Sequence, residues 1–466
     1  MANEVFDAIV IGSGQGGNPL AKAMAEAGWK TAVIERKDVG GTCVNVGCTP
    51  TKTLVASARV AYLAQRAREF GVITREGSGY PVSMDMAAVI ARKREVVRVW
   101  RTGSERALEE TPNLTLIRGE ASFTGAHYVS VAFSNGSVKE LEAKRIFINT
   151  GTRTAVPEIA GLSEVPFLNN ESIMELETLP KHLIVLGGGY IALEFAQMFR
   201  RFGSAVTIVQ KGSTLAEHED ADVSEEITSI LRKDGIEVQL QAETARVRRE
   251  GASIVLTVKI GGAEHEIGGT HLLVAVGRVP NTEALHCERA GVALDAHGFV
   301  KVNSRLETTA EGIWAIGDVK GGPAFTHISY DDYRVLRTNL LEGGSREITG
   351  RPLPYTMFID PELGRIGMTE DEARKAGKKI KVAKMPMSSV ARAFESAETR
   401  GFLKAIVDAD TDQILGAAVL GVDGGEIAAQ IQIAMMGKLT ASTLREGIWS
   451  HPTRAEALNR LFSSYQ

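Results

Sequence analysis

Two of the chain's three cysteines lie five positions apart in the segment GGTCVNVGC. Cys43 and Cys48 can form a disulfide only where their Cα atoms approach to about 4.4–6.8 Å. Five residues of regular helix advance about 7.5 Å along the axis. We therefore expect a bent turn, for which Gly40, Gly41 and Gly47 supply the backbone freedom.

The apolar run TLVASARVAYL, shortly after Cys48, predicts a helix whose positive N-terminal end would stabilise a thiolate. A disulfide that closes so short a loop would add little to the stability of the fold. With only Cys43, Cys48 and Cys287, the chain lacks the disulfide framework of a secreted protein. We expect Cys287 to be a small structural thiol. The spacing leaves a redox pair and a metal site open.

The composition predicts a chain with more than one hydrophobic core. Its 466 residues are 44% hydrophobic, which suits two or three domains. The net charge of −4 gives no reason to expect nucleic acid or an anionic membrane surface as a partner. Without a signal-peptide pattern or an apolar run of about 18 residues, we expect a cytoplasmic protein with no membrane partner.

The opening run FDAIVIGSGQGGNPLAKAMAEAGWKTAVIER has the pattern of a strand, a turn, a helix and a second strand. Gly12, Gly14 and Gly17 form G-x-G-x-x-G at the turn, where backbone amides can approach a pyrophosphate. Glu35 ends the second strand and can accept hydrogen bonds from a ribose hydroxyl. This combination predicts a dinucleotide site.

The same pattern recurs in HLIVLGGGYIALEFAQMFRRFGSAVTIVQKG, with Gly187, Gly189 and Ala192 in the three positions. It predicts either a second dinucleotide or a duplicated fold with one idle site. Here the second strand ends at Gln210 and Lys211 instead of an acid. Because a carboxylate would repel a 2′-phosphate, its absence slightly favours NADPH over NADH. Lys211 could equally be an ordinary surface charge.

Further strands connect these two units. IFINTGT and LLVAVGRVPN each return the chain from one unit to the other, and GIWAIGDV is an apolar strand that ends in Gly317 and Asp318. The Asp318 carboxylate could bind a polyol chain or cap a helix. After about residue 345 the composition changes to strands followed by helices, which predicts a third domain.

In chain order, the sequence contains GSGQGG, GGTCVNVGCTPTKTL, TGT, GGGYIALEFA, AVGRVPN, AIGDV, DPELGRIGMTE and HPTRAEAL. In this ordered set it resembles the class I pyridine nucleotide-disulfide oxidoreductases, such as glutathione reductase, dihydrolipoamide dehydrogenase and mercuric reductase. The resemblance implies an α/β fold with two Rossmann-like dinucleotide-binding domains and a C-terminal α+β dimerisation domain. The FAD domain is expected at 1–150 and 278–344, the NAD(P) domain at 151–277 and the dimerisation domain at 345–466.

The resemblance also implies catalytic roles. Cys48 is similar to the thiol that makes the charge-transfer contact with the flavin, and Cys43 to the interchange thiol that attacks the substrate. Lys52 and Glu194 resemble an ion pair near the flavin N5, and Tyr190 resembles the aromatic lid over the nicotinamide pocket. Helix packing and a surface charge are the alternatives for Tyr190 and Glu194.

The segment HPTRAEAL carries His451 and Glu456. Disulfide exchange needs a proton acceptor and then a donor, and an imidazole held by a carboxylate can be both. In the family this histidine belongs to the partner subunit, so the resemblance implies a homodimer. The residues expected to bind FAD and NADPH or NADH are Gly12, Gly14, Gly17, Glu35, Gly41, Thr42, Thr150, Gly151, Asp318, Gly187, Gly189, Tyr190, Gln210, Lys211, Gly277 and Arg278. No metal-ligating residues are expected.

Several departures bear on the electron acceptor. Mercuric reductases end in a vicinal cysteine pair, but no cysteine follows Cys287, so efficient mercury turnover is not expected. Dihydrolipoamide dehydrogenases usually carry a second histidine and an acid where this chain has Trp449 and Gln210. Glutathione reductase has an arginine pair where this chain has Lys22 and Ala23. FTHISYDDYRVL and TPTKT are most similar to the mercuric-reductase-like branch, which includes a copper(II)-reducing member.

We therefore expect an FAD-dependent NAD(P)H:disulfide oxidoreductase with a role in cell redox homeostasis. Electrons would pass through the Cys43–Cys48 disulfide to a small disulfide or another acceptor. A reductase of Hg(II) or Cu(II) and a dihydrolipoamide dehydrogenase are the alternatives. A flavin redox sensor is less favoured, because a sensor needs no acid/base pair such as His451 and Glu456.

Overall fold

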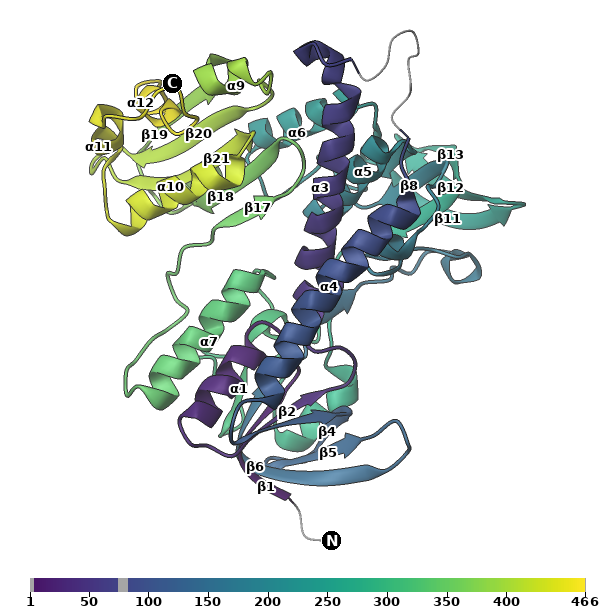
Figure 1. The fold of residues 1–466 in the computed structure, drawn as a ribbon, viewed down its shortest axis with the longest axis vertical. Coiled ribbons are helices and arrows are strands. Elements are labelled where there is room, and N and C mark those ends of the chain that lie inside the picture. Colours follow the sequence, from purple (N-terminus) through teal and green to yellow (C-terminus); the bar gives the residue numbers. More distant parts are fainter. Residues whose placement is uncertain (1–3, 74–82, 466) are drawn as a thin grey trace. The chain divides into compact units, whose positions relative to one another are not determined.

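The computed structural model describes residues 4–73 and 83–465 and has a mixed α/β fold (Figure 1). These residues form two compact units. The first unit comprises Met1–Thr53, Ala88–Ala155 and Gly277–Arg351, and the second comprises Leu54–Ala87, Val156–Val276 and Pro352–Gln466. The boundaries expected for three domains stay a prediction.

The first unit is built on a sheet with the strand order β3-β2-β1-β6-β5-β4, and β16 pairs with β6. Its strands are β1 (Glu4–Ile11), β2 (Thr31–Glu35), β3 (Leu114–Arg118), β4 (Glu120–Gly125), β5 (Tyr128–Ala132), β6 (Val138–Ile148) and β16 (Ile313–Ala315). The pairs β3–β2, β2–β1, β1–β6 and β16–β6 are parallel, whereas β6–β5 and β5–β4 are antiparallel. All five residues of β2 are buried, as expected for a parallel strand covered on both faces.

Helices and short segments complete the first unit. A two-stranded ribbon, β7 (Thr152–Thr154) and β15 (Arg278–Pro280), lies outside the main sheet. The other elements that begin or lie in this part of the chain are α1 (Gly17–Glu26), α2 (Gly41–Asn45), α3 (Cys48–Gln65), α4 (Met86–Glu109), the 3₁₀ helix η6 (Gly317–Lys320) and α7 (Thr326–Leu341). Leu20 and Met24 of α1 pack with Val335 and Leu336 of α7 in one core cluster. α1 is thereby fixed at the end of β1, where the glycine turn lies.

The second unit contains a parallel sheet with the order β10-β9-β8-β14 and a three-stranded antiparallel sheet, β11-β12-β13. The strands are β8 (His182–Leu186), β9 (Ala205–Val209), β10 (Glu237–Gln239), β11 (Glu243–Glu250), β12 (Ser253–Ile260), β13 (Ala263–Gly269) and β14 (His271–Val274). Helices α5 (Tyr190–Phe202) and α6 (Ala221–Lys233) follow β8 and β9. The second βαβ pattern in the sequence is therefore confirmed as β8, α5 and β9.

The second unit also contains a five-stranded antiparallel sheet, β17-β18-β21-β20-β19. Its strands are β17 (Tyr355–Met357), β18 (Glu362–Gly367), β19 (Ile380–Pro386), β20 (Phe402–Asp408) and β21 (Ile414–Gly421). The helices in this stretch are α8 (Glu370–Lys375), α9 (Ala391–Glu395), α10 (Gly424–Met436), α11 (Ala441–Glu446) and α12 (Ala457–Leu461). Leu403, Val419, Ile431 and Phe462 share its core. Within the described residues, no helix has the length and hydropathy needed to cross a membrane.

Candidate functional site

The two cysteines of GGTCVNVGC lie on consecutive helices, the short α2 and the longer α3. Cys43 is half-buried in α2, and Cys48 is exposed at the first residue of α3. Gly41 has a φ of 64°, and a Cβ atom there would lie 2.8 Å from the Cα of Gly14. A Cβ atom on Gly47 would lie 2.8 Å from the carbonyl oxygen of Thr42. The expected bent turn is thus confirmed. At Gly41 it packs against Gly14 of the first glycine turn.

Neither Cys43 nor Cys48 forms a disulfide in this structure. A hydrogen bond with Cys48, followed by burial, raises the pKa of the Cys43 thiol. Cys48 Sγ also lies 3.4 Å from the hydroxyl of Thr326, the first residue of α7. Cys43 therefore keeps its proton at neutral pH, and its reaction as a nucleophile requires a base.

A side-chain network fixes the backbone that carries Cys43. The Asn45 amide donates to the carbonyls of Val39 and Gly41 at 2.9 and 3.0 Å. Arg101, on α4, donates to the Asn45 side-chain oxygen at 2.7 Å and pairs with Asp38 at 3.0 Å. Because Arg101 occupies the acceptor oxygen of Asn45, the amide nitrogen is directed at the carbonyls. Asn45 and Arg101 are therefore positioning residues for the turn.

Hydrogen bonds fix the side chain of Glu35 beside the first glycine turn. Glu35 is buried and accepts hydrogen bonds from the Ser13 amide and hydroxyl at 3.0 and 2.6 Å. Its other oxygen accepts from the Lys37 amide at 2.9 Å. A Cβ atom on Gly12 would come within 2.4 Å of the Asn149 carbonyl oxygen. The turn is thus closed against β6, and the position of Glu35 at the end of β2 agrees with the sequence prediction.

Polar groups expected to hold FAD gather in the same unit. Arg278 donates to the hydroxyl and carbonyl of Thr152 at 2.7 Å each, and Thr152 donates to Asp318 at 3.3 Å. Burial raises the pKa of Asp318, although the Arg278 charge acts in the opposite direction. Two buried oxygens, Thr150 Oγ1 and Asn18 Oδ1, have no hydrogen-bond partner within the described structure. Such groups fit a polar ligand with hydroxyl and phosphate groups.

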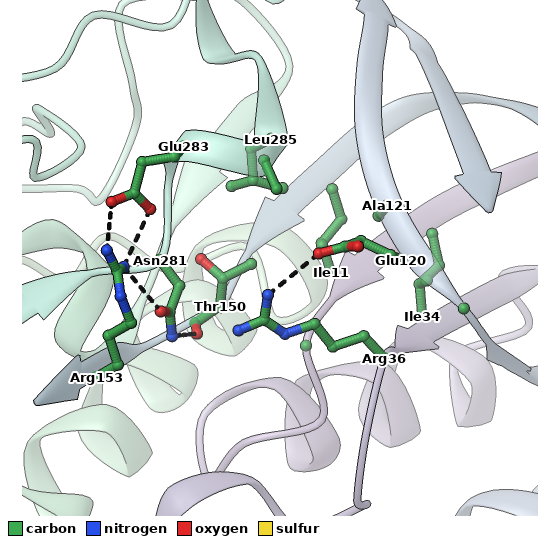
Figure 2. Close-up of a pocket in the computed structure, with 13 residues that line it drawn as sticks. Ile11, Ile34, Arg36, Glu120, Ala121, Thr150, Arg153, Asn281, Glu283 and Leu285 are labelled. Atoms are coloured by element: carbon green, nitrogen blue, oxygen red, sulfur yellow. Dashed lines mark hydrogen bonds and ion pairs between the residues drawn. The ribbon is translucent and has the colours of Figure 1, made fainter. Parts of the chain in front are cut away.

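A pocket opens beside this turn. Its walls include Gly12, Arg36 and Thr150, together with the β4 strand residue Ala121 (Figure 2). Figure 2 shows Arg36 paired with Glu120 on one side and Arg153 paired with Glu283 on the other. Apolar side chains such as Ile34 and Leu285 line the remainder. A concave site with an apolar floor and charged edges next to a glycine turn suits the adenosine part of a dinucleotide.

Gly151 and Gly277, also expected to bind the cofactors, lie in the two segments that connect the units of the chain. The Asn281 side-chain amide donates to the Thr150 carbonyl at 2.9 Å, and the Asn281 backbone N–H donates to the Gly151 carbonyl at 3.0 Å. The Gly277 carbonyl accepts from the Ala155 amide at 2.9 Å. These bonds join the two connecting segments of the first unit.

The second glycine turn lies between β8 and α5. Gly189 precedes the first residue of α5, Tyr190, whose side chain is exposed. Gly187 has a φ of 119°, and a Cβ atom there would lie 2.4 Å from the Ala275 carbonyl oxygen. Gln210 follows β9, as predicted. Lys211 is exposed and pairs with Glu243 at 2.7 Å.

The predicted partners Lys52 and Glu194 lie in different units of the chain. Lys52 is half-buried on α3, whereas Glu194 is buried on α5 and accepts a hydrogen bond from the Phe358 amide at 2.9 Å. Their ion pair near the flavin stays a prediction.

The acid/base pair lies near the C-terminus. His451 Nδ1 lies 2.9 Å from a carboxylate oxygen of Glu456, as the sequence predicts for an imidazole held by an acid. The His451 side chain is 70% exposed in the single chain, whereas that of Glu456 is 20% exposed. Arg454, between them, donates to Asp423 and to the Ser396 hydroxyl. The exposed imidazole can therefore reach a group outside its own chain.

Cys287 has no part in this arrangement. It is buried in the core of the first unit, where burial raises the pKa of its thiol to about 11. The expectation of a structural thiol agrees with this position.

Sequence reasoning did not single out Asn45, Arg101, Thr326 or Glu217, which the structure places at the candidate sites. Asn45 lies inside the cysteine motif, so its position was a usable signal. Arg101 and Thr326 are distant from that motif in sequence, and only the fold brings them to it. Glu217 lies seven residues after the strand end at which an acid is normally sought.

Comparison with known proteins gives consistent matches. Residues 6–332 match the family described as pyridine nucleotide-disulphide oxidoreductase, and residues 353–462 match its dimerisation domain. A probable pyridine nucleotide-disulfide oxidoreductase of Escherichia coli, RclA, is 40% identical over 98% of this chain and 99% of its own. A mercuric reductase of Streptomyces lividans and a dihydrolipoyl dehydrogenase of Thermus scotoductus are each 34% identical over 98% of this chain, which is 95% and 96% of theirs.

Solved structures agree with these matches. The HOCl-induced flavoprotein disulfide reductase RclA from Escherichia coli superposes with a TM-score of 0.88 over 98% of this chain and 99% of that chain, at 40% identity. A structure described as its Cu(II) complex gives a TM-score of 0.89 over 99% of both chains.

Proposed function

The chain belongs to the pyridine nucleotide-disulphide oxidoreductase family, and from this premise we propose that Cys43 and Cys48 are its redox pair. The family resemblance, fold class, enzyme class and cofactors predicted from the sequence are confirmed: it is a family of flavoprotein disulfide reductases that use FAD and NAD(P)H. Residues at the first glycine turn, such as Gly12, Glu35 and Thr150, would hold FAD, which would supply the relay of two electrons from NAD(P)H to the cysteine pair. The adjacent thiols on the bent turn are the observation that carries the proposal.

The chain's own residues then perform a thiol–disulfide exchange. Cys43 loses its proton to His451 of the partner subunit, and its thiolate attacks one sulfur of the substrate disulfide. A mixed disulfide forms, and the leaving thiolate takes the proton back from the imidazolium. The Cys48 thiol then loses its proton to the imidazole, and its thiolate attacks the Cys43 sulfur. This breaks the mixed disulfide, forms the Cys43–Cys48 disulfide and releases the second substrate thiolate, which takes that proton from the imidazolium. The substrate disulfide gains the two electrons that the cysteine pair loses.

The requirement for a base follows from the thiol itself. Because the hydrogen bond with Cys48 and burial raise the pKa of Cys43, little thiolate forms at neutral pH without a proton acceptor. His451 can accept that proton at Nε2, since its Nδ1 is hydrogen-bonded to Glu456. We therefore propose a homodimer that shares its active sites, as the match to the dimerisation domain supports.

A thiol count tests the redox pair. Anaerobic addition of NAD(P)H to the oxidised FAD-loaded enzyme should create two new thiols per chain, titrated after denaturation. Cys43→Ser and Cys48→Ser should each abolish both this gain and turnover of a disulfide. Cys287→Ser is the matched control and should retain both. No gain of thiols in the wild type would overturn the proposal.

Copper(II) is the second candidate acceptor, because one of the similar solved structures is described as a Cu(II) complex. We place a small disulfide first, because the paired thiols of Cys43 and Cys48 can perform thiol–disulfide exchange directly. NAD(P)H oxidation with a panel of small disulfides, dihydrolipoamide, Cu(II) and Hg(II) separates these acceptors. A reaction with a metal ion alone would move the assignment to metal reduction.

We place this reaction in the cytoplasm and in cell redox homeostasis. A cysteine pair that cycles between thiol and disulfide needs a continuous supply of reductant, as in a reducing compartment. Cell fractionation with an antibody to the chain tests the location. Recovery with the secreted fraction would contradict it.

A further inference from the structure

The loop after β9 contributes an acid to the second glycine turn. The carboxylate of Glu217 accepts a hydrogen bond from the side-chain amide of Gln210 at 2.8 Å. Gln210 is the residue at the position that normally carries the ribose-binding acid. Glu217 is therefore next to that position in space, although it lies seven residues further along the chain.

Two contacts place this loop against the glycine turn itself. The Ala216 amide donates to the Gly188 carbonyl at 2.9 Å. A Cβ atom on Gly188 would lie within about 3 Å of the Gln210 side chain, at 2.9 Å from its amide carbon. Gln210 and its partner Glu217 thus lie beside the turn that faces the pyrophosphate and adjoining ribose of a bound dinucleotide.

Gly212 makes room for the carboxylate. A Cβ atom on Gly212 would overlap Glu217 Oε1, at a separation of 1.5 Å. Glu217 is exposed, so a ligand can reach it. Its Oε1 atom accepts from Gln210, and a carboxylate has further lone pairs that can accept from a ribose hydroxyl.

The neighbouring cation does not reverse the local charge. Lys211 pairs with Glu243 at 2.7 Å, and both side chains are largely exposed. The three groups Lys211, Glu243 and Glu217 carry a net charge of about −1 at neutral pH. A 2′-phosphate would have to approach this acidic group, whereas a 2′-hydroxyl could donate to it.

We propose that Glu217 recognises the ribose 2′-hydroxyl of the pyridine nucleotide and makes the enzyme prefer NADH to NADPH. This inference rests on one part of the proposed function, which is that the pyridine nucleotide binds at the second glycine turn. It replaces the slight preference for NADPH that the absence of an acid at Gln210 suggests.

Binding of two unreactive fragments tests the preference without turnover. The oxidised FAD-loaded enzyme is titrated calorimetrically with ADP-ribose and with 2′-phospho-ADP-ribose. The wild type should bind ADP-ribose more tightly. Glu217→Gln keeps an acceptor for Gln210 but removes the charge, and should shift the ratio of the two dissociation constants about five- to tenfold toward the phosphorylated fragment.

Two further variants separate local from general effects. Glu264→Gln makes the same change in net charge at an exposed position of β13 and should leave the ratio unchanged. Gly212→Ala should displace the Glu217 carboxylate and shift the ratio in the same direction as Glu217→Gln.

A wild-type preference for the phosphorylated fragment, or an unchanged ratio in Glu217→Gln, would overturn the inference while leaving the redox function intact. An equal shift in Glu264→Gln would overturn it as well. Failure of both fragments to bind the wild type would instead remove the nucleotide site on which the proposed function also depends.

Discussion

Cys43 and His451, the two groups proposed to exchange a proton, are held by their surroundings in different ways. Cys43 is half-buried on a turn whose carbonyls are bound by Asn45, which Arg101 fixes in turn. His451 is 70% exposed, and its ring is held through Glu456. The thiol side of the chemistry is thus organised within one unit of a single chain. The base is presented at the surface of that chain, as a residue offered to another subunit must be.

The largest effect should come from removing the exposed base. His451→Ala should slow turnover of a disulfide by about 10²–10⁴-fold, because a positioned acid/base contributes about this factor. Flavin reduction by NAD(P)H should change little, since no Cys43 proton moves in that step. Stopped-flow absorbance and steady-state turnover measure the two steps, and the exposed His286→Ala is the control. Equal loss in both steps would contradict the assignment.

Mixed dimers sharpen the same comparison. Heterodimers of Cys43→Ser and His451→Ala chains contain one site with both lesions and one with neither if the site is shared between subunits. Turnover should then recover toward half of the wild-type value. No recovery after verified subunit exchange would place the base in the same chain as Cys43.

The sequence predicts the parts of this comparison that are local in the chain. The bent cysteine turn, both glycine turns and the His451–Glu456 pair depend on residues a few positions apart. Strand and helix periodicity locates the glycine turns, the cysteine spacing indicates the bent turn, and the family resemblance implies the His451–Glu456 pair. Arg101 could not be found in this way, because its contact with Asn45 joins elements 56 residues apart. The order of the C-terminal sheet, in which β18 pairs with β21 and β19 lies at the edge beside β20, also lies beyond the sequence pattern, which predicts only strands followed by helices after about residue 345. Glu217 was missed because a loop, not a strand end, brings it to Gln210.

The second prediction concerns the hydrogen-bond network of Asn45 and Arg101 that fixes the cysteine turn. Asn45→Ala leaves the Val39 and Gly41 carbonyls without their side-chain donor and should lower the free energy of unfolding by about 1–3 kcal/mol. Arg98→Ala, on the exposed face of α4, should leave it nearly unchanged, because the ion pair of Arg98 with Glu95 is open to solvent. Chemical denaturation of the FAD-loaded enzyme measures both. Similar values for the two variants would show that the turn does not depend on this network.

A third prediction uses the raised pKa of Cys43. In the reduced enzyme, Cys48→Ala removes the hydrogen bond that keeps Cys43 protonated, so the Cys43 pKa should fall. Alkylation of Cys43 by iodoacetamide at pH 8 should then accelerate about three- to fourfold for each unit of that fall, because the thiolate fraction rises while the nucleophilicity of the thiolate declines. Peptide mass spectrometry separates it from Cys287, whose burial and pKa of about 11 should keep it slow in both proteins. An unchanged Cys43 rate would exclude Cys48 as the cause.

The same shift has a defined sign for stability. A thiol whose folded pKa lies above its unfolded value of about 8.5 favours the folded state below pH 8.5, and this contribution is lost as pH rises toward the folded pKa. The reduced wild type should therefore lose stability above about pH 8.5 more steeply than reduced Cys43→Ser. Parallel pH dependences would contradict the raised pKa.

The smallest effect should come from Arg454, which anchors the loop that carries His451 and Glu456. Arg454 donates to Asp423 and Ser396, and it lies between His451 and Glu456 in sequence. Arg454→Lys retains the charge but not the forked geometry. Because partly exposed ion pairs contribute about 0.2–1 kcal/mol, turnover should fall only about 1.4- to fivefold. Arg392→Lys, in an exposed pair with Glu395, is the control and should not change turnover.

A merely structural role for Arg454 can be separated from positioning of the base by comparing the two half-reactions. If Arg454 holds the loop so that Glu456 reaches His451, Arg454→Lys should slow disulfide turnover while flavin reduction by NAD(P)H and the free energy of unfolding stay unchanged, because only the thiol exchange uses the imidazole. A lower free energy of unfolding with an equal loss in both half-reactions would assign Arg454 to folding of the loop alone. A loss as large as that of His451→Ala would show that the exposed side is as rigidly organised as the cysteine turn, and the contrast between the two would fail.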